Sequence, residues 1–98
     1  MWGEIENKKI TNIKESYCLG EACLIFEYGK EASRTIAFNK SYDLKKALEL
    51  MKSGDKNFTV ERIGREIHII KANSKLILSL VNTTHAERFE DVLRNYKK

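Results

Sequence analysis

Two segments of the chain run from a short apolar strand through a polar break directly into an amphipathic helix. They are residues 34–51 and residues 75–96. The first helix carries one apolar stripe at the i, i+3, i+4 and i+7 spacing, made of Leu44, Ala47, Leu48 and Met51. The second carries a similar stripe of Ala86, Phe89, Leu93 and Tyr96, with Val92 at its flank. Both patterns predict helices that bury one face.

The polar residues around these helices predict where they begin and end. Ser41 is the expected N-cap of the first helix, and Asp43 complements the positive helix end. Gly54 is expected to end it, because glycine adopts the left-handed conformation that follows many helices. The segment from Thr84 to Glu87 fits a capping box at the start of the second helix.

We expect residues 1–8 to form either a frayed N-terminus or a first edge strand. The following residues of the first half predict three strands, an irregular one at Ile10–Tyr17, a strong one at Ala22–Tyr28 and a third at Arg34–Asn39. Pairing the last two across the loop at residues 29–33 sets Phe26 beside Ile36 and predicts one apolar inner face.

The second half has clearer turns. Gly64-Arg65 suits a two-residue type II′ hairpin between strands at Phe58–Ile63 and Glu66–Lys71. Asn73-Ser74 then turns the chain into a strand at Leu76–Val81. The resulting inner face consists of Phe58, Val60, Ile67, Ile69, Leu76, Leu78 and Leu80.

The two halves share one plan. Shifting the first by 42 residues places Ile36 on Leu78, Phe38 on Leu80, Ser41 on Thr83, Ala47 on Phe89 and Met51 on Leu93. The predicted fold is one α+β domain over residues 1–98, a duplicated β-β-β-α unit with halves at about 9–54 and 57–98. We expect a two-layer antiparallel sheet with both helices packed on one face.

The face of the sheet that the helices leave uncovered is unusually apolar for a solvated surface. On the predicted register it exposes three large aliphatic side chains, Ile25, Ile70 and Ile77. Either strong sheet curling buries them within the chain, or a partner covers them, most simply a second copy in a homodimer.

The composition of the chain limits which class of protein it belongs to and where it is expected to be located. The chain is 42% hydrophobic and 33% charged, as in ordinary folded proteins. It has no apolar run near the roughly 20 residues that span a bilayer. The N-terminus lacks the plan of a signal peptide, so a cytoplasmic location is expected.

Candidate chemistry is sparse. His68 and Glu61 should face each other on neighbouring strands, but no nucleophile or third group accompanies them. Cys18 and Cys23 lie far from the histidines along the chain, which disfavours zinc, and across their hairpin either a disulfide or reduced thiols would fit. His85, at a helix start, is either a solvated residue or a phosphate contact. We therefore expect no enzymatic activity, metal or cofactor.

The net charge of +4 favours an acidic partner. Basic residues gather at predicted strand ends and turns, and tyrosines could stack on bases, as single-strand binders require. The residues predicted to bind nucleic acid are Tyr28, Lys30, Arg34, Arg62, Arg65, His68, Lys71 and Lys75, with Tyr17 as a second stacking ring.

The segments Arg34–Leu44 and Leu76–Ala86 each run from a strand through a polar cap into a helix. This outline resembles the PUR, Whirly and positive-cofactor group of single-stranded nucleic-acid binders, which place four strands before the helix where three are predicted here. The resemblance implies an antiparallel sheet, a dimer, and binding of single-stranded DNA or RNA. It assigns no individual residue.

A second class of function fits the same surface. The uncovered face, with Ile25, Ile70 and Ile77, would suit a protein-interaction module such as a subunit, adaptor or inhibitor.

Overall fold

The β-β-β-α pattern occurs twice in the computed structural model, which describes residues 9–97. The first half contains β1 (Asn12–Cys18), β2 (Glu21–Tyr28), β3 (Ala32–Ala37) and α1 (Ser41–Ser53). The second half contains β4 (Thr59–Ile63), β5 (Glu66–Lys71), β6 (Ser74–Ser79) and α2 (Thr83–Tyr96). The predicted α+β class and the predicted duplication are both confirmed. The segment predicted at residues 1–8 lies outside the described residues.

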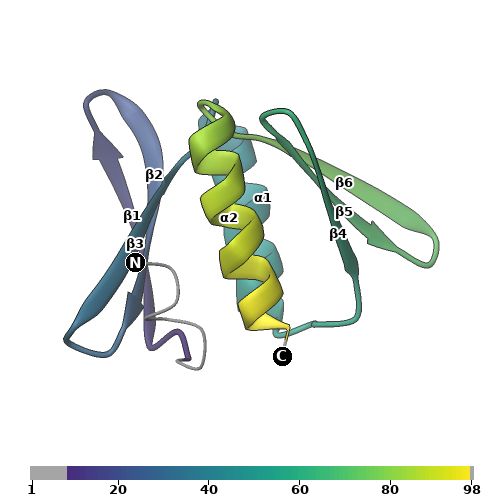
Figure 1. Ribbon diagram of the computed structural model, residues 1–98, viewed down its shortest axis with the longest axis horizontal. Coiled ribbons are helices and arrows are strands. Elements are labelled where there is room, and N and C mark those ends of the chain that lie inside the picture. The colour runs from purple at the N-terminus through teal and green to yellow at the C-terminus, as the bar shows by residue number, and fades with distance from the viewer. Residues whose placement is uncertain (1–8, 98) are drawn as a thin grey trace.

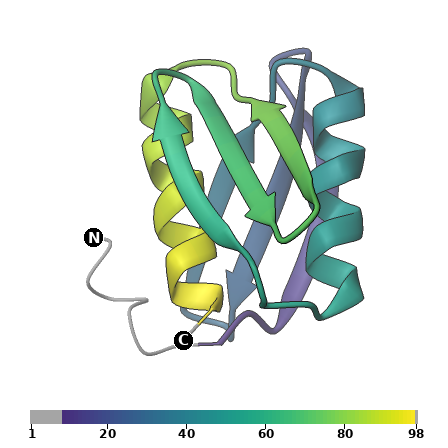
Figure 2. The same ribbon diagram turned by 90° about the vertical axis from the view of Figure 1, so that its right-hand side faces the viewer.

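The layers differ from the predicted arrangement. Each half forms its own antiparallel three-stranded sheet, in the orders β1-β2-β3 and β4-β5-β6. Figure 1 shows the two helices lying between the two sheets, and Figure 2 shows them on either side of the β4-β5-β6 sheet. Each helix contacts both sheets, α1 through β2 and β6, and α2 through β3, β4 and β5. The two sheets therefore enclose the helices, and their outer faces point in opposite directions (Figure 1).

The register of the first half is displaced by two residues from the prediction. Leu24 pairs with Ile36, whereas Phe26 pairs with Arg34. The reason is that β3 begins already at Ala32, directly after a short turn, so the predicted five-residue loop is too long. The inner face is unchanged, because side chains alternate with a period of two and a shift of two residues keeps them on the same side.

The first hairpin is more regular than its sequence pattern indicated. All seven residues of β1 pair with β2, from Asn12 opposite Glu27 to Cys18 opposite Glu21. The two turn residues, Leu19 and Gly20, both have positive φ, at 55° and 83°. This is the backbone of a type I′ turn, which matches the twist of the strands it joins. Leu19 thus holds a left-handed conformation in a fully exposed position.

The second half follows the prediction closely. The two-residue turn at Gly64-Arg65 is confirmed, with Gly64 at φ 61°, and Ile63 pairs with Glu66 across it. Strand β6 starts and ends two residues earlier than predicted, at Ser74–Ser79. The predicted inner face is confirmed, since Leu76 is partly buried against the core and the others are buried, namely Phe58, Val60, Ile67, Ile69, Leu78 and Leu80.

Both helices start earlier than the sequence suggested, α1 by one residue and α2 by two. The N-cap of α1 is Lys40, without a side-chain cap, so the predicted Ser41 cap is wrong. The N-cap of α2 is Asn82, whose Oδ1 accepts from the backbone N–H of His85 at 2.9 Å, so the predicted capping box at Thr84 is also wrong. The predicted end of α1 at Gly54 is confirmed, with φ at 74°.

The two halves meet where β3 and β6 end. Phe38 and Leu80, both fully buried, form an isolated antiparallel bridge between the sheets. On either side of it a backbone N–H donates to a carbonyl of the other half, from Asn39 to Ser79 (2.9 Å) and from Val81 to Ala37 (3.1 Å). Each donor or acceptor in one half lies 42 residues from its counterpart in the other, so the bridge sits on the symmetry axis of the duplication.

Side chains at the helix starts complete this junction. The backbone N–H of Ala37 donates to Nδ1 of His85 (3.0 Å), and that of Ser79 donates to Oδ1 of Asp43 (3.3 Å). The two acceptors occupy equivalent positions in the two helices. Each helix start therefore satisfies a strand-edge donor of the opposite half, which would otherwise stay unpaired at a partly buried site.

Replacing Leu19 by asparagine should stabilise the protein. Asparagine tolerates the left-handed conformation of this turn position better than leucine does, and the fully exposed Leu19 side chain contributes no packing that would be lost. We expect the free energy of unfolding to rise by about 1 kcal/mol in urea denaturation. Leu19→Val, which is β-branched, should lower it, and a Leu19→Asn variant no more stable than the wild type would contradict this account.

Acid should weaken the junction on the His85 side, because Nδ1 can accept a hydrogen bond only while it carries no proton. Burial of the ring, followed by the nearby Arg88 charge, holds the pKa of His85 below its ordinary 6.5, while Glu21 opposes the shift. The unfolded chain therefore takes up the proton first as the pH falls. The contribution of His85 to stability is full above pH 6.5 and is lost below it, as the pH falls through the lowered folded pKa.

Urea denaturation at about pH 7.5 and about pH 5.5, above most carboxylate titration, measures this effect. The wild type should be less stable at the lower pH, and His85→Gln should lose most of the difference. Equal pH dependence in both proteins would show that His85 does not carry it.

Candidate functional site

Two residues predicted to bind nucleic acid are buried. Tyr28 is 3% exposed and belongs to the core of the first half. Its hydroxyl has no hydrogen-bond partner among residues 9–97, and burial raises the pKa of Tyr28 to about 12, against a smaller opposing effect of Arg34. His68 is 7% exposed. The predicted stacking role of Tyr28 is therefore wrong, because its ring is not accessible, and the His68 ring is covered to a similar extent.

His68 sits in the middle of the outer face of the second sheet. It lies opposite Glu61, as predicted, but its Nε2 lies 3.1 Å from Oε1 of Glu66, two residues earlier on the same strand. Its Nδ1 is buried without a partner in the described part of the chain. The carboxylate of Glu66 orients the ring.

Two predicted cations are engaged within the protein. Nε of Arg62 lies 3.3 Å from Oε1 of Glu90, and its NH1 donates to the carbonyl of Gly64 at 3.1 Å. Nζ of Lys71 lies 2.9 Å from Oδ2 of Asp55. Arg62 therefore ties β4 to α2, and Lys71 ties β5 to the segment after α1.

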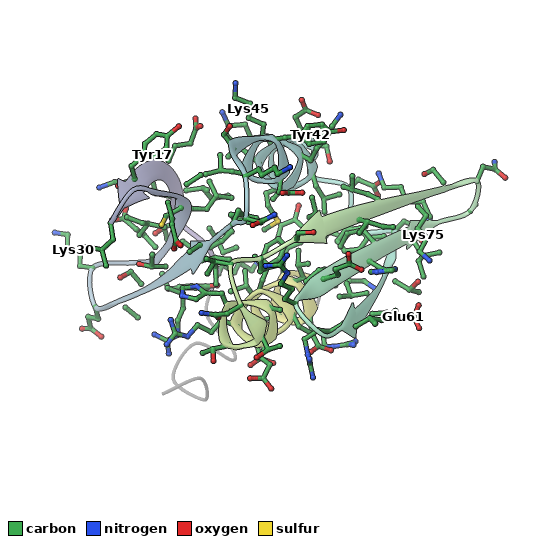
Figure 3. All side chains as sticks on the ribbon, turned by 90° about the horizontal axis from the view of Figure 1, so that it is seen from above. Tyr17, Lys30, Tyr42, Lys45, Glu61 and Lys75 are labelled. Atoms are coloured by element: carbon green, nitrogen blue, oxygen red, sulfur yellow. The ribbon has the colours of Figure 1, made fainter. Side chains whose placement is uncertain are left out.

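The remaining predicted cations do not form one surface. Lys30 lies in the turn between β2 and β3, whereas Lys75 lies on β6, and Figure 3 shows the two at opposite ends of the molecule. Arg65 occupies the exposed turn between β4 and β5. Arg34 lies on the inner side of β3, opposite Phe26, and donates to the carbonyl of Ser33 at 3.0 Å. Tyr17 is 74% exposed on β1.

The three isoleucines of the predicted interface lie on two different surfaces. Ile25 is on the outer face of the first sheet, whereas Ile70 and Ile77 are on that of the second, which points the other way (Figure 1). They cannot form one patch, so this grouping is wrong. Ile63 was missed, although it is 57% exposed and the alternation of β4 places it on the same outer face as the latter pair. The homodimer stays a prediction.

A groove of about 290 Å³ separates α1 from the β5-β6 hairpin. Its apolar lining is made of Leu50 from α1, Ile69 from β5 and Leu76 from β6. Charged and hydroxyl side chains complete the lining, namely Lys46, Glu49, Ser53, Lys71 and Ser74. The groove therefore combines aliphatic surface with polar groups, which is the usual character of a small binding site.

Asp55 stands beside the groove through its contact with Lys71. The backbone N–H of Asn57 donates to its Oδ1 at 2.8 Å, and this bond, followed by the interaction with Lys71, holds the pKa of Asp55 below its usual range. The pair is more than a third exposed on both sides, so it contributes little to stability. Lys71 can therefore exchange this partner for another at small cost.

One wall of the groove is an open strand edge. Ser79 directs its N–H and carbonyl away from β5, toward Asp43 and Asn39. Because these groups alternate along an antiparallel strand, Lys75 and Ile77 direct theirs the same way. Beyond the junction, β6 has no further strand on that side in the described structure, and Figure 2 shows α1 next to it. The groove therefore lies beside unpaired main-chain groups.

Sequence reasoning missed this groove because its walls come from residues 46–53 and 69–76. No motif links the two segments. The register of the β5-β6 hairpin does place Lys71 and Leu76 on its inner side. It does not show how closely α1 packs against them, and so it does not predict a groove.

Two features that would indicate a function are absent from residues 9–97. No cluster of three or more His, Cys, Asp or Glu side chains could hold a metal ion there. None of the helices in that range is long and apolar enough to cross a membrane.

The buried thiol of Cys23 donates to the carbonyl of Glu21 at 3.4 Å.

Comparison with known proteins returned no match, whether to protein families, to curated proteins or to solved structures.

Arg62→Ala should lower the free energy of unfolding by about 1 kcal/mol, because it removes a partly buried ion pair with Glu90 and the hydrogen bond to the Gly64 carbonyl. Arg65→Ala, at an exposed position on the adjacent turn, should change it little. Urea denaturation measures both. Equal stability of the two variants would mean that the Arg62 contacts are not structural.

Proposed function

We propose that this protein is a non-enzymatic protein-interaction module that binds an extended polypeptide segment in the groove between α1 and β6. The observation that carries the proposal is the position of an apolar groove of about 290 Å³ beside an open strand edge. An added strand gains main-chain hydrogen bonds from the edge and places alternate side chains in the groove. The proposal retains the protein-interaction module predicted from the sequence. It places the binding surface in the groove instead of on the outer face of the sheet.

The backbone groups available to such a segment are those of Lys75 and Ile77. A strand laid beside them would continue on the side where Asn39 already pairs with Ser79. Side chains that point inward from it would meet Leu76, Ile69 and Leu50. Side chains that point outward would join the outer sheet face beside Ile77, which is 47% exposed.

Charge supports this choice over nucleic acid. Arg62 and Lys71 have carboxylate partners, and Lys30 and Lys75 lie at opposite ends of the molecule (Figure 3). A backbone-neutralising surface needs several cations in one line. Binding of single-stranded nucleic acid stays a prediction from the net charge.

Ile77→Pro should weaken peptide binding at least tenfold while leaving the fold intact. Proline removes an N–H that points to the open edge, so the pairing of β6 with β5 survives. Thr35→Pro is the matched control, because Thr35 is the counterpart of Ile77 on the β3 edge of the first half. The probe is a displayed library of random peptides of about nine residues, selected on the full chain and re-synthesised for fluorescence polarisation.

Selected peptides that bind the wild type and Thr35→Pro but not Ile77→Pro would support strand addition. A library that yields no binder, or binders that tolerate Ile77→Pro, would overturn the proposal. A labelled single-stranded oligonucleotide measured at about 50 mM salt tests the other class, since phosphate contacts are strong there. Oligonucleotide binding that survives while every peptide fails would favour nucleic acid.

A further inference from the structure

The internal duplication indicates what fits into the groove. The strand registers place β5 on β2 with a shift of 43 residues and β6 on β3 with a shift of 42. The groove between α1 and the β5-β6 hairpin thus corresponds to the contact between α2 and the β2-β3 hairpin. Three of its lining residues have counterparts of different size, since Ile69 corresponds to Phe26, Lys71 to Tyr28 and Leu76 to Arg34.

In the first half this space is filled by aromatic rings. Phe26 is fully buried and stacks on Phe89 of α2, with ring centroids 6.3 Å apart. Phe38 meets Phe89 edge-on at 5.3 Å, and Tyr28 is buried beside this cluster in the same core.

In the second half the corresponding positions hold no ring. Ile69 replaces Phe26, Ala47 replaces Phe89 and Lys71 replaces Tyr28. Of these three residues, Ile69 and Lys71 line the groove, whereas Ala47 is fully buried and is not part of its lining. Relative to the first half, the ring volumes missing at the groove are therefore those of Phe26 and Tyr28, on a backbone of the same plan.

The polar rim suits a ring with a polar tip. Lys71, Ser53 and Ser74 line the groove, and Lys71 pairs with Asp55 at a site where both side chains are more than a third exposed. In the first half the hydroxyl of Tyr28 is buried without a partner among the described residues. A phenol that entered the groove would find a donor in Lys71 and so avoid that cost.

We infer that the bound polypeptide segment is anchored by an aromatic side chain, with tyrosine preferred, inserted between α1 and β6 on Leu50, Ile69 and Leu76. This inference rests on the proposed function and specifies its ligand. The ring would bury apolar area at the centre of the contact, where anchor residues contribute most of the binding energy. The main-chain pairing along Lys75 and Ile77 would set its position.

The test uses synthetic peptides Thr-Val-Thr-X-Thr-Val-Thr, in which X is Ala, Leu, Phe or Tyr. Their alternation makes them strand-forming and places X on the same side as the valines. Affinity for the full chain is measured by fluorescence polarisation. The peptides with Tyr or Phe at X should bind about thirtyfold more tightly than the peptide with Ala, and the Tyr peptide should bind most tightly. The Leu peptide should have an affinity between those of the Phe and Ala peptides.

Two variants test where the ring sits. Lys71→Tyr combined with Leu76→Arg copies Tyr28 and Arg34 of the first half, should fill the groove and should remove the aromatic preference. Lys71→Tyr alone serves the same purpose if the double variant does not fold by circular dichroism. Glu61→Tyr is the control, because Glu61 is exposed on the outer face of β4, outside the groove and the β6 edge, and the same ring added there should leave the preference unchanged.

The outcomes separate the two proposals. If no peptide of the series and no library peptide binds the wild type, the proposed function fails. If peptides bind with the Ile77→Pro sensitivity but equally for every X, the aromatic anchor fails and the function stands. A preference that persists in the groove-filled variants would also overturn the anchor.

Discussion

The contact between Phe38 and Leu80 is the interaction on which the rest of the structure depends. It joins two three-stranded sheets that otherwise share no strand pairing, and it does so at the point where each strand passes into its helix. The bridge is closed by two backbone hydrogen bonds and by two more from helix-start side chains, Asp43 and His85. Since each acceptor comes from the opposite half, neither half can satisfy its strand edge alone.

The junction also explains the arrangement of the layers. Two sheets held only at their strand ends are free to diverge, and the space between them is filled by both helices (Figure 1). Each helix therefore packs against both sheets rather than against one. Neither helix covers the outer faces, and along β6 the gap beside α1 remains incompletely filled.

The duplication makes the differences between the halves informative. A backbone of the same plan supports an aromatic cluster around Phe89 on one side and the smaller Ala47 and Ile69 on the other. The chemistry at the junction differs as well. Asp43 offers a carboxylate oxygen as the acceptor, whereas His85 offers a ring nitrogen that accepts only when it carries no proton. Any function of this protein is expected to use such differences rather than the shared plan.

Much of the fold could be predicted from local pattern. Alternation along the strands identified the inner face, helical spacing identified the buried stripes, and Gly64-Arg65 identified a hairpin. The two-residue displacement of β3 could not be seen, because both registers put Leu24, Phe26 and Ile36 on the same face. Both helix starts were misplaced, since α1 begins after Lys40 without any side-chain cap, and α2 is capped by Asn82 rather than by the Thr84 hydroxyl.

The candidate site depended far more on the tertiary structure. Whether a basic residue such as Arg62 or Lys71 is available to a ligand depends on carboxylates distant in sequence, Glu90 and Asp55. The separation of Ile25 from Ile77 follows from how the outer faces of the two sheets point in opposite directions. The sequence by itself determined which side chains face inward, because the periods of strands and helices are local properties. Only the packing of α1 against β6 decided that a groove remains, because its width depends on side chains from both halves.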